Sequence, residues 1–228
     1  AKEAGLNSFN LDLMHGLPGQ SLDDALSDLK QIIALNPPHI SWYQLTIEPN
    51  TQFASKPPTL PQDETLWDIQ EQGQALLAQA GYQQYEISGY AKPGYQCQHN
   101  LNYWRFGDYL GIGCGAHGKV TDAKTGVITR TEKVKHPRGY MDIIKPYLYK
   151  SWQVEQDDLA FEFFMNRFRL IEPCPINDFN ALTQQPLQSQ QHALDKAINA
   201  GLLTKTDSHW HVTLQGQRFL NDLLALFV

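Results

Sequence analysis

Residues 8–47 read SFNLDLMHGLPGQSLDDALSDLKQIIALNPPHISWYQLTI, and this stretch decides the fold class. Apolar and polar side chains alternate over residues 8–13, which is the period of a β-strand. Ser21 then suits the N-cap of a helix whose apolar positions keep helical spacing until Pro37. Residues 40–47 are rich in aromatic and β-branched side chains and predict a second strand. This order of strand, helix and strand predicts a parallel βαβ unit.

The chain continues in the same style up to about residue 150. Residues 61–80 predict a helix that ends before Gly81, and residues 82–88 predict a short strand. A hairpin is expected over 120–131, and Pro137 opens a short helix that should reach about residue 147. We therefore predict an α/β domain over residues 1–150.

Residues 151–228 predict a second, mainly helical domain. The expected elements are helices over 157–171, 189–200 and 214–227 and a hairpin over 202–212. Helix, hairpin and helix in this order are winged-helix-like, and such modules often bind DNA. The helix over 189–200, however, contains Lys196 as its only basic residue, beside Asp195. A structural or partner-docking role is therefore the better interpretation of this domain.

Composition and charge exclude several classes of protein. The 228 residues include 5 Trp, 10 Tyr and 10 Phe, too many aromatic side chains for a disordered chain. The sequence has neither an apolar run long enough to cross a bilayer nor the pattern of a signal peptide. Residues 119–150 hold 8 basic and 3 acidic groups within a chain of net charge −6. That segment suits carboxylates or phosphates, although a solvated hairpin surface is the simpler interpretation, and the acidic remainder disfavours nucleic-acid binding.

Cys97, Cys114 and Cys174 are too few and too scattered for a disulfide framework, which favours a reducing compartment. Their spacing contains no CxxC element. These cysteines therefore predict neither an iron–sulfur cluster nor a structural zinc site within this sequence.

Asp12 is the first candidate site residue, because it ends the polar face of the first predicted strand. In parallel βα folds, functional residues lie at the carboxyl ends of strands. A carboxylate there can accept hydrogen bonds from a ribose diol, and it would need a partner if it were buried. An aspartate that only bonds a neighbouring loop is the alternative.

A second candidate site lies in residues 97–105, which read CQHNLNYWR. A histidine, a thiol, flat rings and a cation suit a planar aromatic ligand with carboxylates, such as a porphyrin. The imidazole of His99 would ligate iron, and Arg105 would meet propionates. A buried, hydrogen-bonded His99 is the alternative. His117 and the pair His209 and His211 are weaker ligand candidates.

Several segments together resemble the coproporphyrinogen III dehydrogenase-like radical SAM family. They are NLDLMHGLPGQ at 10–20, YEIS at 85–88, AKPG at 91–94, HNLNYW at 99–104 and YLGIGCGAHG at 109–118. The HNxxYW element at 99–104 is similar to the haem chaperone branch of that family. The tail from about residue 155 resembles the family's C-terminal domain, so the resemblance covers nearly the whole chain.

The resemblance implies a fold and a set of cofactors. The family fold is an incomplete (β/α)6 barrel, of which this chain would form the last part, plus a C-terminal domain. A [4Fe-4S] cluster is held on three N-terminal cysteines, and S-adenosylmethionine fills its fourth iron site. Asp12 matches the family's S-adenosylmethionine-binding aspartate. His99, Asn100, Tyr103 and Trp104 belong to the motif implicated in haem binding, with His99 as the candidate iron ligand.

The resemblance also implies a function, namely binding haem and delivering it to respiratory haem proteins from the cytoplasm, near the membrane. The alternative is an oxygen-independent coproporphyrinogen III dehydrogenase, an enzyme that acts on porphyrinogen propionates. The family's cluster cysteines are absent from this sequence, so we expect a C-terminal portion that does not cleave S-adenosylmethionine alone. Open barrel edges would favour association of the chain, for example as a homodimer.

Overall fold

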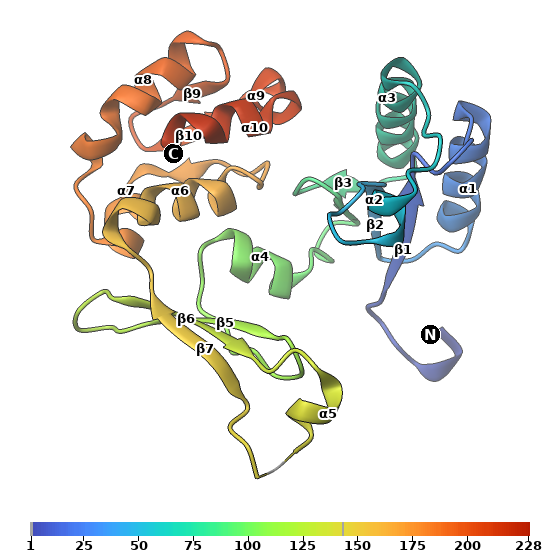
Figure 1. Cartoon of the computed structure of the whole chain (residues 1–228). Helices are drawn as coiled ribbons and strands as arrows, with labels where there is room; N and C mark the ends of the chain where they lie inside the picture. The colour runs from blue at the N-terminus through green and yellow to red at the C-terminus, as the bar shows by residue number, and fades with distance from the viewer. Residues whose placement is uncertain (1, 143) are drawn as a thin grey trace. The chain divides into compact units, whose positions relative to one another are not determined.

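The computed structural model describes residues 2–142 and 144–228 (Figure 1). The chain forms two compact units, residues 1–97 and residues 98–228, and each unit has its own hydrophobic core. The domain boundary predicted near residue 150 stays a prediction. Within the described residues, no helix is both long and apolar enough to span a bilayer.

The first unit is a four-stranded sheet with helices packed on it. Its elements are η1 (Lys2–Ala4), β1 (Asn10–His15), α1 (Leu22–Ala34), β2 (His39–Gln44), α2 (Gln52–Ser55), α3 (Asp63–Gln79), β3 (Gln83–Gln84) and β4 (Gly89–Ala91). The strand order is β1-β2-β4-β3, and β1 and β2 are parallel, which confirms the predicted βαβ unit. Helices α1 and α3 lie side by side (Figure 1).

Local sequence explains why α1 forms where it does. The Ser21 hydroxyl accepts a hydrogen bond from the Asp24 backbone N–H, and the Asp24 carboxylate accepts one from the Ser21 N–H. This capping box satisfies two helix-end donors. Along the helix, Ala25 and Leu29 are buried and pack in one core with Ile40 and Trp42 of β2. That core therefore covers one face of the sheet and leaves the other face to polar side chains.

The segment predicted as one strand over 82–88 contains instead only the two-residue strand β3 and a turn that leads into β4. β3 and β4 are antiparallel to each other, and β4 is also antiparallel to β2. The chain reverses between them, where the Tyr85 N–H donates to the Gly89 carbonyl over 3.1 Å. A Cβ on Gly89 would lie 2.4 Å from Oε1 of Glu86 and 2.8 Å from Cε1 of the buried Tyr85 ring, so a larger residue here would force both side chains to move.

The second unit contains two small antiparallel sheets and a helical core. Its elements up to the second sheet are α4 (Gln98–Trp104), β5 (His117–Thr121), β6 (Ile128–Lys133), α5 (Pro137–Tyr140), β7 (Leu148–Gln153), α6 (Gln156–Arg167) and β8 (Cys174–Pro175). The remaining elements are α7 (Ile176–Thr183), η2 (Leu187–Gln190), α8 (Gln191–Asn199), β9 (Leu203–Lys205), β10 (His209–Val212), α9 (Leu214–Arg218), α10 (Leu220–Leu224) and η3 (Ala225–Phe227).

Both predicted hairpins, β5–β6 and β9–β10, are confirmed, whereas two predicted helices are shorter than expected. The helix that Pro137 opens ends at Tyr140, whereas the prediction extended it to about residue 147. Residue 143, within that predicted span, lies outside the described residues. The last helix breaks at Phe219, whose φ of −113° and ψ of 44° are not helical. The break turns α10 so that Leu223 and Leu224 are buried.

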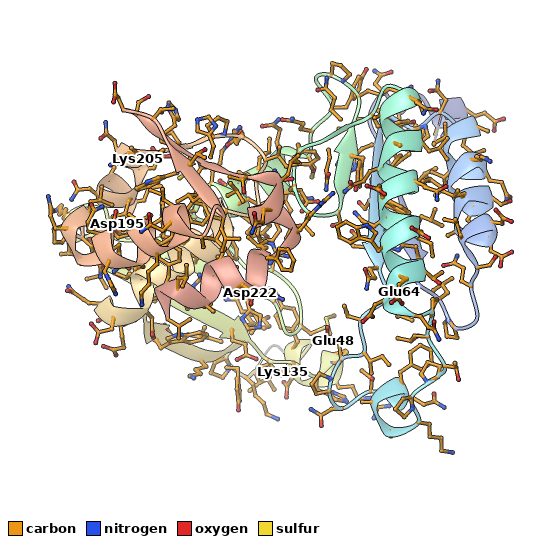
Figure 2. All side chains as sticks on the ribbon, turned by 90° about the horizontal axis from the view of Figure 1, so that it is seen from above. Glu48, Glu64, Lys135, Asp195, Lys205 and Asp222 are labelled. Atoms are coloured by element: carbon orange, nitrogen blue, oxygen red, sulfur yellow. The ribbon has the colours of Figure 1, made fainter. Side chains whose placement is uncertain are left out.

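An aromatic core holds the second unit together. Phe164 of α6 packs against Phe168, Phe179, Trp210 and Phe227, with ring centroids 4.1–5.9 Å apart across the group. The outer surface of this part is mixed in charge, and Asp195, Lys205 and Asp222 all project outward (Figure 2).

Candidate functional site

Asp12 lies on the polar face of the first unit's sheet, which we define by Asn10, Asp12, His39, Ser41 and Tyr43. These residues alternate along β1 and β2, and the register pairs Asn10 with His39 and Asp12 with Ser41. Alternate residues of a strand share one face, so the sequence pattern itself collects these polar groups.

Asp12 is exposed, so its carboxylate avoids the desolvation cost that burial would impose. Its Oδ1 accepts hydrogen bonds from the Asn10 side-chain amide at 2.8 Å and from the Tyr43 hydroxyl at 3.3 Å. The partners are strand residues, and not a loop as the alternative interpretation expected. Within the described residues both bonds go to Oδ1, which leaves Oδ2 as an acceptor for a diol. This acceptor oxygen therefore fits the ribose diol of S-adenosylmethionine.

His39 is a site residue that the sequence reasoning missed. It is buried, and desolvation lowers its pKa, so the ring is neutral near pH 7. Nδ1 lies 2.7 Å from the side-chain oxygen of Asn10, and Nε2 lies 2.8 Å from the Tyr85 hydroxyl. Nδ1 therefore carries the proton, and Nε2 accepts from Tyr85, which itself accepts from the Cys97 N–H at 3.4 Å. The alternation of His39 with Ser41 and Tyr43 in the sequence indicates that these three side chains share one face of the strand.

The cysteines do not form a site for an iron–sulfur cluster. Cys97, Cys114 and Cys174 are free thiols that are half-buried, exposed and buried, respectively. Over residues 2–142 and 144–228, no group of three or more His, Cys, Asp or Glu side chains could hold a metal. These residues therefore do not fit the cluster of the family.

The HNxxYW element, the predicted haem motif, lies entirely within the helix α4. His99 is exposed, which contradicts the alternative of a buried histidine, and Asn100 is half-buried. His99 and Tyr103 are one helical turn apart, and their ring centroids lie 4.5 Å apart in an edge-on contact. Tyr103 in turn contacts Tyr109 at 4.3 Å. This stack holds the imidazole on the outside of α4 while its nitrogens stay accessible, which fits an iron ligand.

Trp104 and Arg105 contact the segment that follows α6. The guanidinium of Arg169 lies 4.7 Å from the centroid of the Trp104 indole. The indole N–H of Trp104 is buried and, within the described residues, has no hydrogen-bond partner. Arg105 donates from Nε and Nη2 to the two carboxylate oxygens of Glu172, at 2.9 and 2.7 Å. The expectation that Arg105 meets propionates stays a prediction, and in this structure the fork of Arg105 holds the carboxylate of Glu172.

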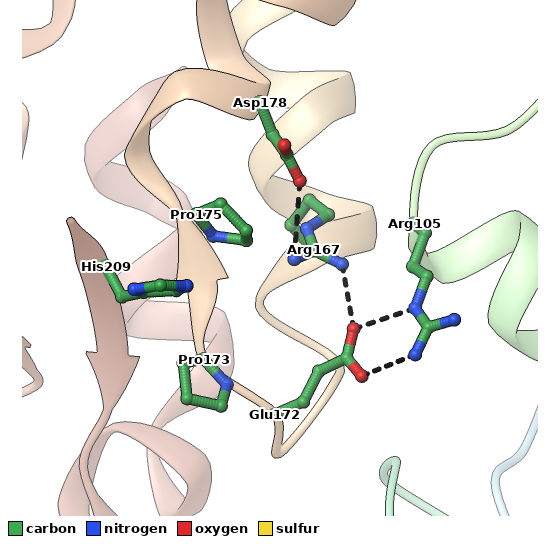
Figure 3. A pocket seen from close by; sticks show the side chains of 7 residues that line it. All are labelled: Arg105, Arg167, Glu172, Pro173, Pro175, Asp178 and His209. Atoms are coloured by element: carbon green, nitrogen blue, oxygen red, sulfur yellow. Dashed lines mark hydrogen bonds and ion pairs between the residues drawn. The ribbon is translucent and has the colours of Figure 1, made fainter.

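Glu172 joins two arginines at the edge of a pocket of about 340 Å³ (Figure 3). Arg167 is buried, and it donates to Glu172 at 3.2 Å and lies 3.7 Å from Asp178. The hydrogen bonds from Arg105 lower the pKa of Glu172, so the carboxylate stays charged. The residues lining the pocket are Arg105, Arg167, Glu172, Pro173, Pro175, Asp178 and His209.

Much of the basic segment over 119–150 is neutralised within the unit. Lys119 is buried, and its ammonium bonds Asp108 at 3.0 Å. Arg130 pairs with Glu162, and Lys135 with Glu132. A solvated hairpin surface therefore explains only part of this basic segment. Lys119 is buried instead, and its ion pair with Asp108 stabilises the fold.

The weaker histidine candidates do not assemble into a metal site. His117 is exposed on β5. The rings of His209 and His211 lie 6.4 Å apart on β10, and Nδ1 of His209 is 2.8 Å from the Ser208 hydroxyl. Asp12 belongs to the first unit, whereas all four residues of the haem motif belong to the second.

Known proteins resemble this chain over its whole length. Residues 154–219 match the HemN C-terminal domain family. The chain is 62% identical to the heme chaperone HemW of Escherichia coli K12 over 228 residues, which are 100% of this chain and 60% of that protein. It is 58% identical to the HemW of Haemophilus influenzae, covering 100% of this chain and 59% of that one. The chain thus spans about 60% of the length of these curated relatives.

A solved structure confirms the predicted fold class. Coproporphyrinogen III oxidase (HemN) from Escherichia coli, described as a radical SAM enzyme, superimposes with a TM-score of 0.77 at 20% identity. The alignment covers 99% of this chain and 56% of that one. The chain therefore shares the fold of that structure. By its sequence, the chain belongs to the HemN-like family, in the branch that contains the HemW proteins.

Proposed function

We propose that this chain belongs to a haem chaperone and carries the haem on α4, with His99 as the ligand of the iron. The observation that carries the proposal is the exposed imidazole of His99, held edge-on by Tyr103 at the start of α4. The relatives named heme chaperone, at 62% and 58% identity, support the haem as cargo. A bound haem supplies an iron with open axial positions and two carboxylates.

The residues of α4 would divide the work of binding. His99 offers a ring nitrogen to the iron, and Tyr103 fixes the orientation of that ring. Burial raises the pKa of the Tyr103 hydroxyl, so that side chain stays neutral near pH 7. Asn100 and Trp104 add a half-buried amide and an indole on the same helix.

Haem titration tests this proposal. The chain is titrated with haemin, and binding is followed by absorption for the chain itself, for His99→Ala and for His117→Ala. His117 is a matched control, because it is also an exposed histidine of the second unit. We expect the dissociation constant to rise at least about tenfold in His99→Ala, which is about 1.4 kcal/mol, and to stay unchanged in His117→Ala. Equal affinity for His99→Ala and the unchanged chain would contradict the proposal.

The second candidate function is oxidation of a porphyrinogen, and the solved structure that shares the fold carries that name. Its identity of 20% supports the fold alone, whereas the HNxxYW element and the more similar relatives favour the chaperone. Turnover of coproporphyrinogen by the whole protein, loaded with its cluster and S-adenosylmethionine, would overturn this preference. The [4Fe-4S] cluster belongs to the proposal for the whole protein, with Asp12 holding the S-adenosylmethionine ribose.

We propose the remaining partners on the resemblance alone. The acceptors would be respiratory haem proteins, reached from the cytoplasmic side of the membrane. Loss of haem from the loaded protein, faster with an apo respiratory haem protein than with buffer, is the expected result. Sedimentation of the haem-loaded and haem-free chain tests for a homodimer, and flotation with vesicles tests for membrane association.

A further inference from the structure

The junction between α4 and the segment after α6 is a rigid clamp, which we define by Trp104, Arg105, Arg169 and Glu172. Trp104 is the last residue of the HNxxYW element, and Arg105 follows it directly. Arg169 and Glu172 lie in the part of the chain that matches the HemN C-terminal domain. Arg105 and Glu172 share two parallel hydrogen bonds, and Trp104 and Arg169 share a cation–π contact. A bidentate pair restricts orientation as well as distance, unlike a single ionic contact.

Buried side chains hold the clamp in place. Glu172 also accepts from Arg167, whose side chain is 2% exposed and whose Nε donates to the Cys174 sulfur at 3.4 Å. Next along the chain, Phe106 is buried and packs its ring on Phe163 of α6 at 5.6 Å. The three consecutive residues 104–106 therefore each contact the C-terminal part of the unit. Such a junction fixes both the position and the tilt of α4.

We infer that Arg105 and Glu172 are positioning residues that set the coordinates of the His99 imidazole, an inference that rests on the function proposed above. His99 is at the opposite end of α4 from Arg105. A seven-residue helix is about 10 Å long, so a tilt of about 15° moves its far end by about 3 Å. Metal–ligand distances tolerate changes of only about 0.2 Å. Release of the clamp thus removes His99 from an optimal position without touching the haem.

The exposure of Arg105 makes the inference testable. Its side chain is 48% exposed, so Arg105→Gln should leave the fold intact while it removes the bidentate pair. Glu172 is the poorer target, because it also compensates the buried charge of Arg167. Arg105→Lys keeps the charge but loses the fork, and Arg218→Gln removes an exposed arginine from α9 as a control.

A double-mutant cycle on haemin binding decides between positioning and direct contact. Dissociation constants are measured for the chain, Arg105→Gln, His99→Ala and the double variant. We expect Arg105→Gln to weaken binding about 3- to 10-fold and to reduce the histidine-ligated fraction of the spectrum, with Arg105→Lys intermediate and Arg218→Gln unchanged. In the His99→Ala background, Arg105→Gln should have no further effect.

Each other outcome overturns the inference in a recognisable way. An equal loss on Arg105→Gln with and without His99 would make Arg105 a direct haem contact. No loss in the chain that retains His99 would show that the clamp does not position the ligand, while the proposed function would survive. No effect of His99→Ala itself would remove the proposed haem ligand and, with it, the positioning role.

Discussion

Gly73, in the middle of α3, lies directly over the indole of Trp42, and its replacement gives the sharpest test of the fold. An alanine Cβ at this position would be 1.8 Å from Cη2 of Trp42 and 2.6 Å from both Cζ2 and Cζ3. Contacts below 3.0 Å essentially never occur, so the indole or the helix must move. The indole is 2% exposed and touches the ring of His15 at 4.3 Å, which blocks its retreat.

Two opposing effects set the expected magnitude for Gly73→Ala. Alanine favours a helix interior over glycine by about 1 kcal/mol. Overpacking of a filled core costs about 1–3 kcal/mol, and a clash with a buried ring lies at the upper end of that range. We therefore expect Gly73→Ala to lower the free energy of unfolding of the first unit by about 2 kcal/mol.

Hydrogen exchange of the β2 amides measures this change within the first unit. Ala75→Gly, at an exposed position of the same helix, is the control and should cost about 1 kcal/mol through helix propensity alone. In a Trp42→Phe background, Gly73→Ala should lose most of its penalty, because the smaller ring leaves space for a methyl group. A stabilisation of about 1 kcal/mol by Gly73→Ala in the unchanged chain would refute the packing of α3 on β2.

Three further predictions concern buried titratable groups. Burial lowers the pKa of His15 from 6.5 to about 4, so the stability it contributes is complete above pH 6.5 and is lost as the pH falls towards 4. That loss reaches up to about 3 kcal/mol, and His15→Phe should flatten the profile of unfolding free energy between those values. Lys119→Met should cost about 1–3 kcal/mol in urea unfolding, because the buried ammonium bonds Asp108, and an unchanged midpoint would argue against that pair. Burial raises the pKa of Cys174 to about 11, so a thiol reagent should modify exposed Cys114 in the native chain and Cys174 only after unfolding, as mass spectrometry can check.

The sequence predicts the local helices and strands of this fold better than it predicts which strands pair and in which direction. The strand at β1 and the start of α1 depend on alternation and on the Ser21 cap, which are local signals, and both are confirmed. The direction of β4 depends instead on a turn closed by Gly89 and on pairing with β2, about fifty residues earlier. No residue within 82–88 indicates that pairing. The sequence therefore predicts a single strand there, where the chain forms β3 and a turn.

The candidate site shows the same division. The HNxxYW element lies on one short helix, α4, which the sequence analysis does not predict. The sequence shows the element itself, whose role in haem binding stays a prediction, whereas the exposure of His99 comes from the structure. The partner of Arg105 is Glu172, 67 residues later, and its bidentate geometry requires the three-dimensional structure. His39 was overlooked because a single histidine in a strand resembles a core residue, and its two hydrogen-bond partners come from β1 and from the turn at Tyr85.

The identity of the axial ligand tests the central claim most directly. Magnetic circular dichroism of the ferric haem complex reports whether a histidine nitrogen coordinates the iron. We predict a histidine-ligated signature for the unchanged chain and for His117→Ala, and its loss in His99→Ala at protein concentrations that keep the haem bound. The same histidine signature in His99→Ala would place the iron on another residue and contradict the assignment of α4 as the haem-carrying helix.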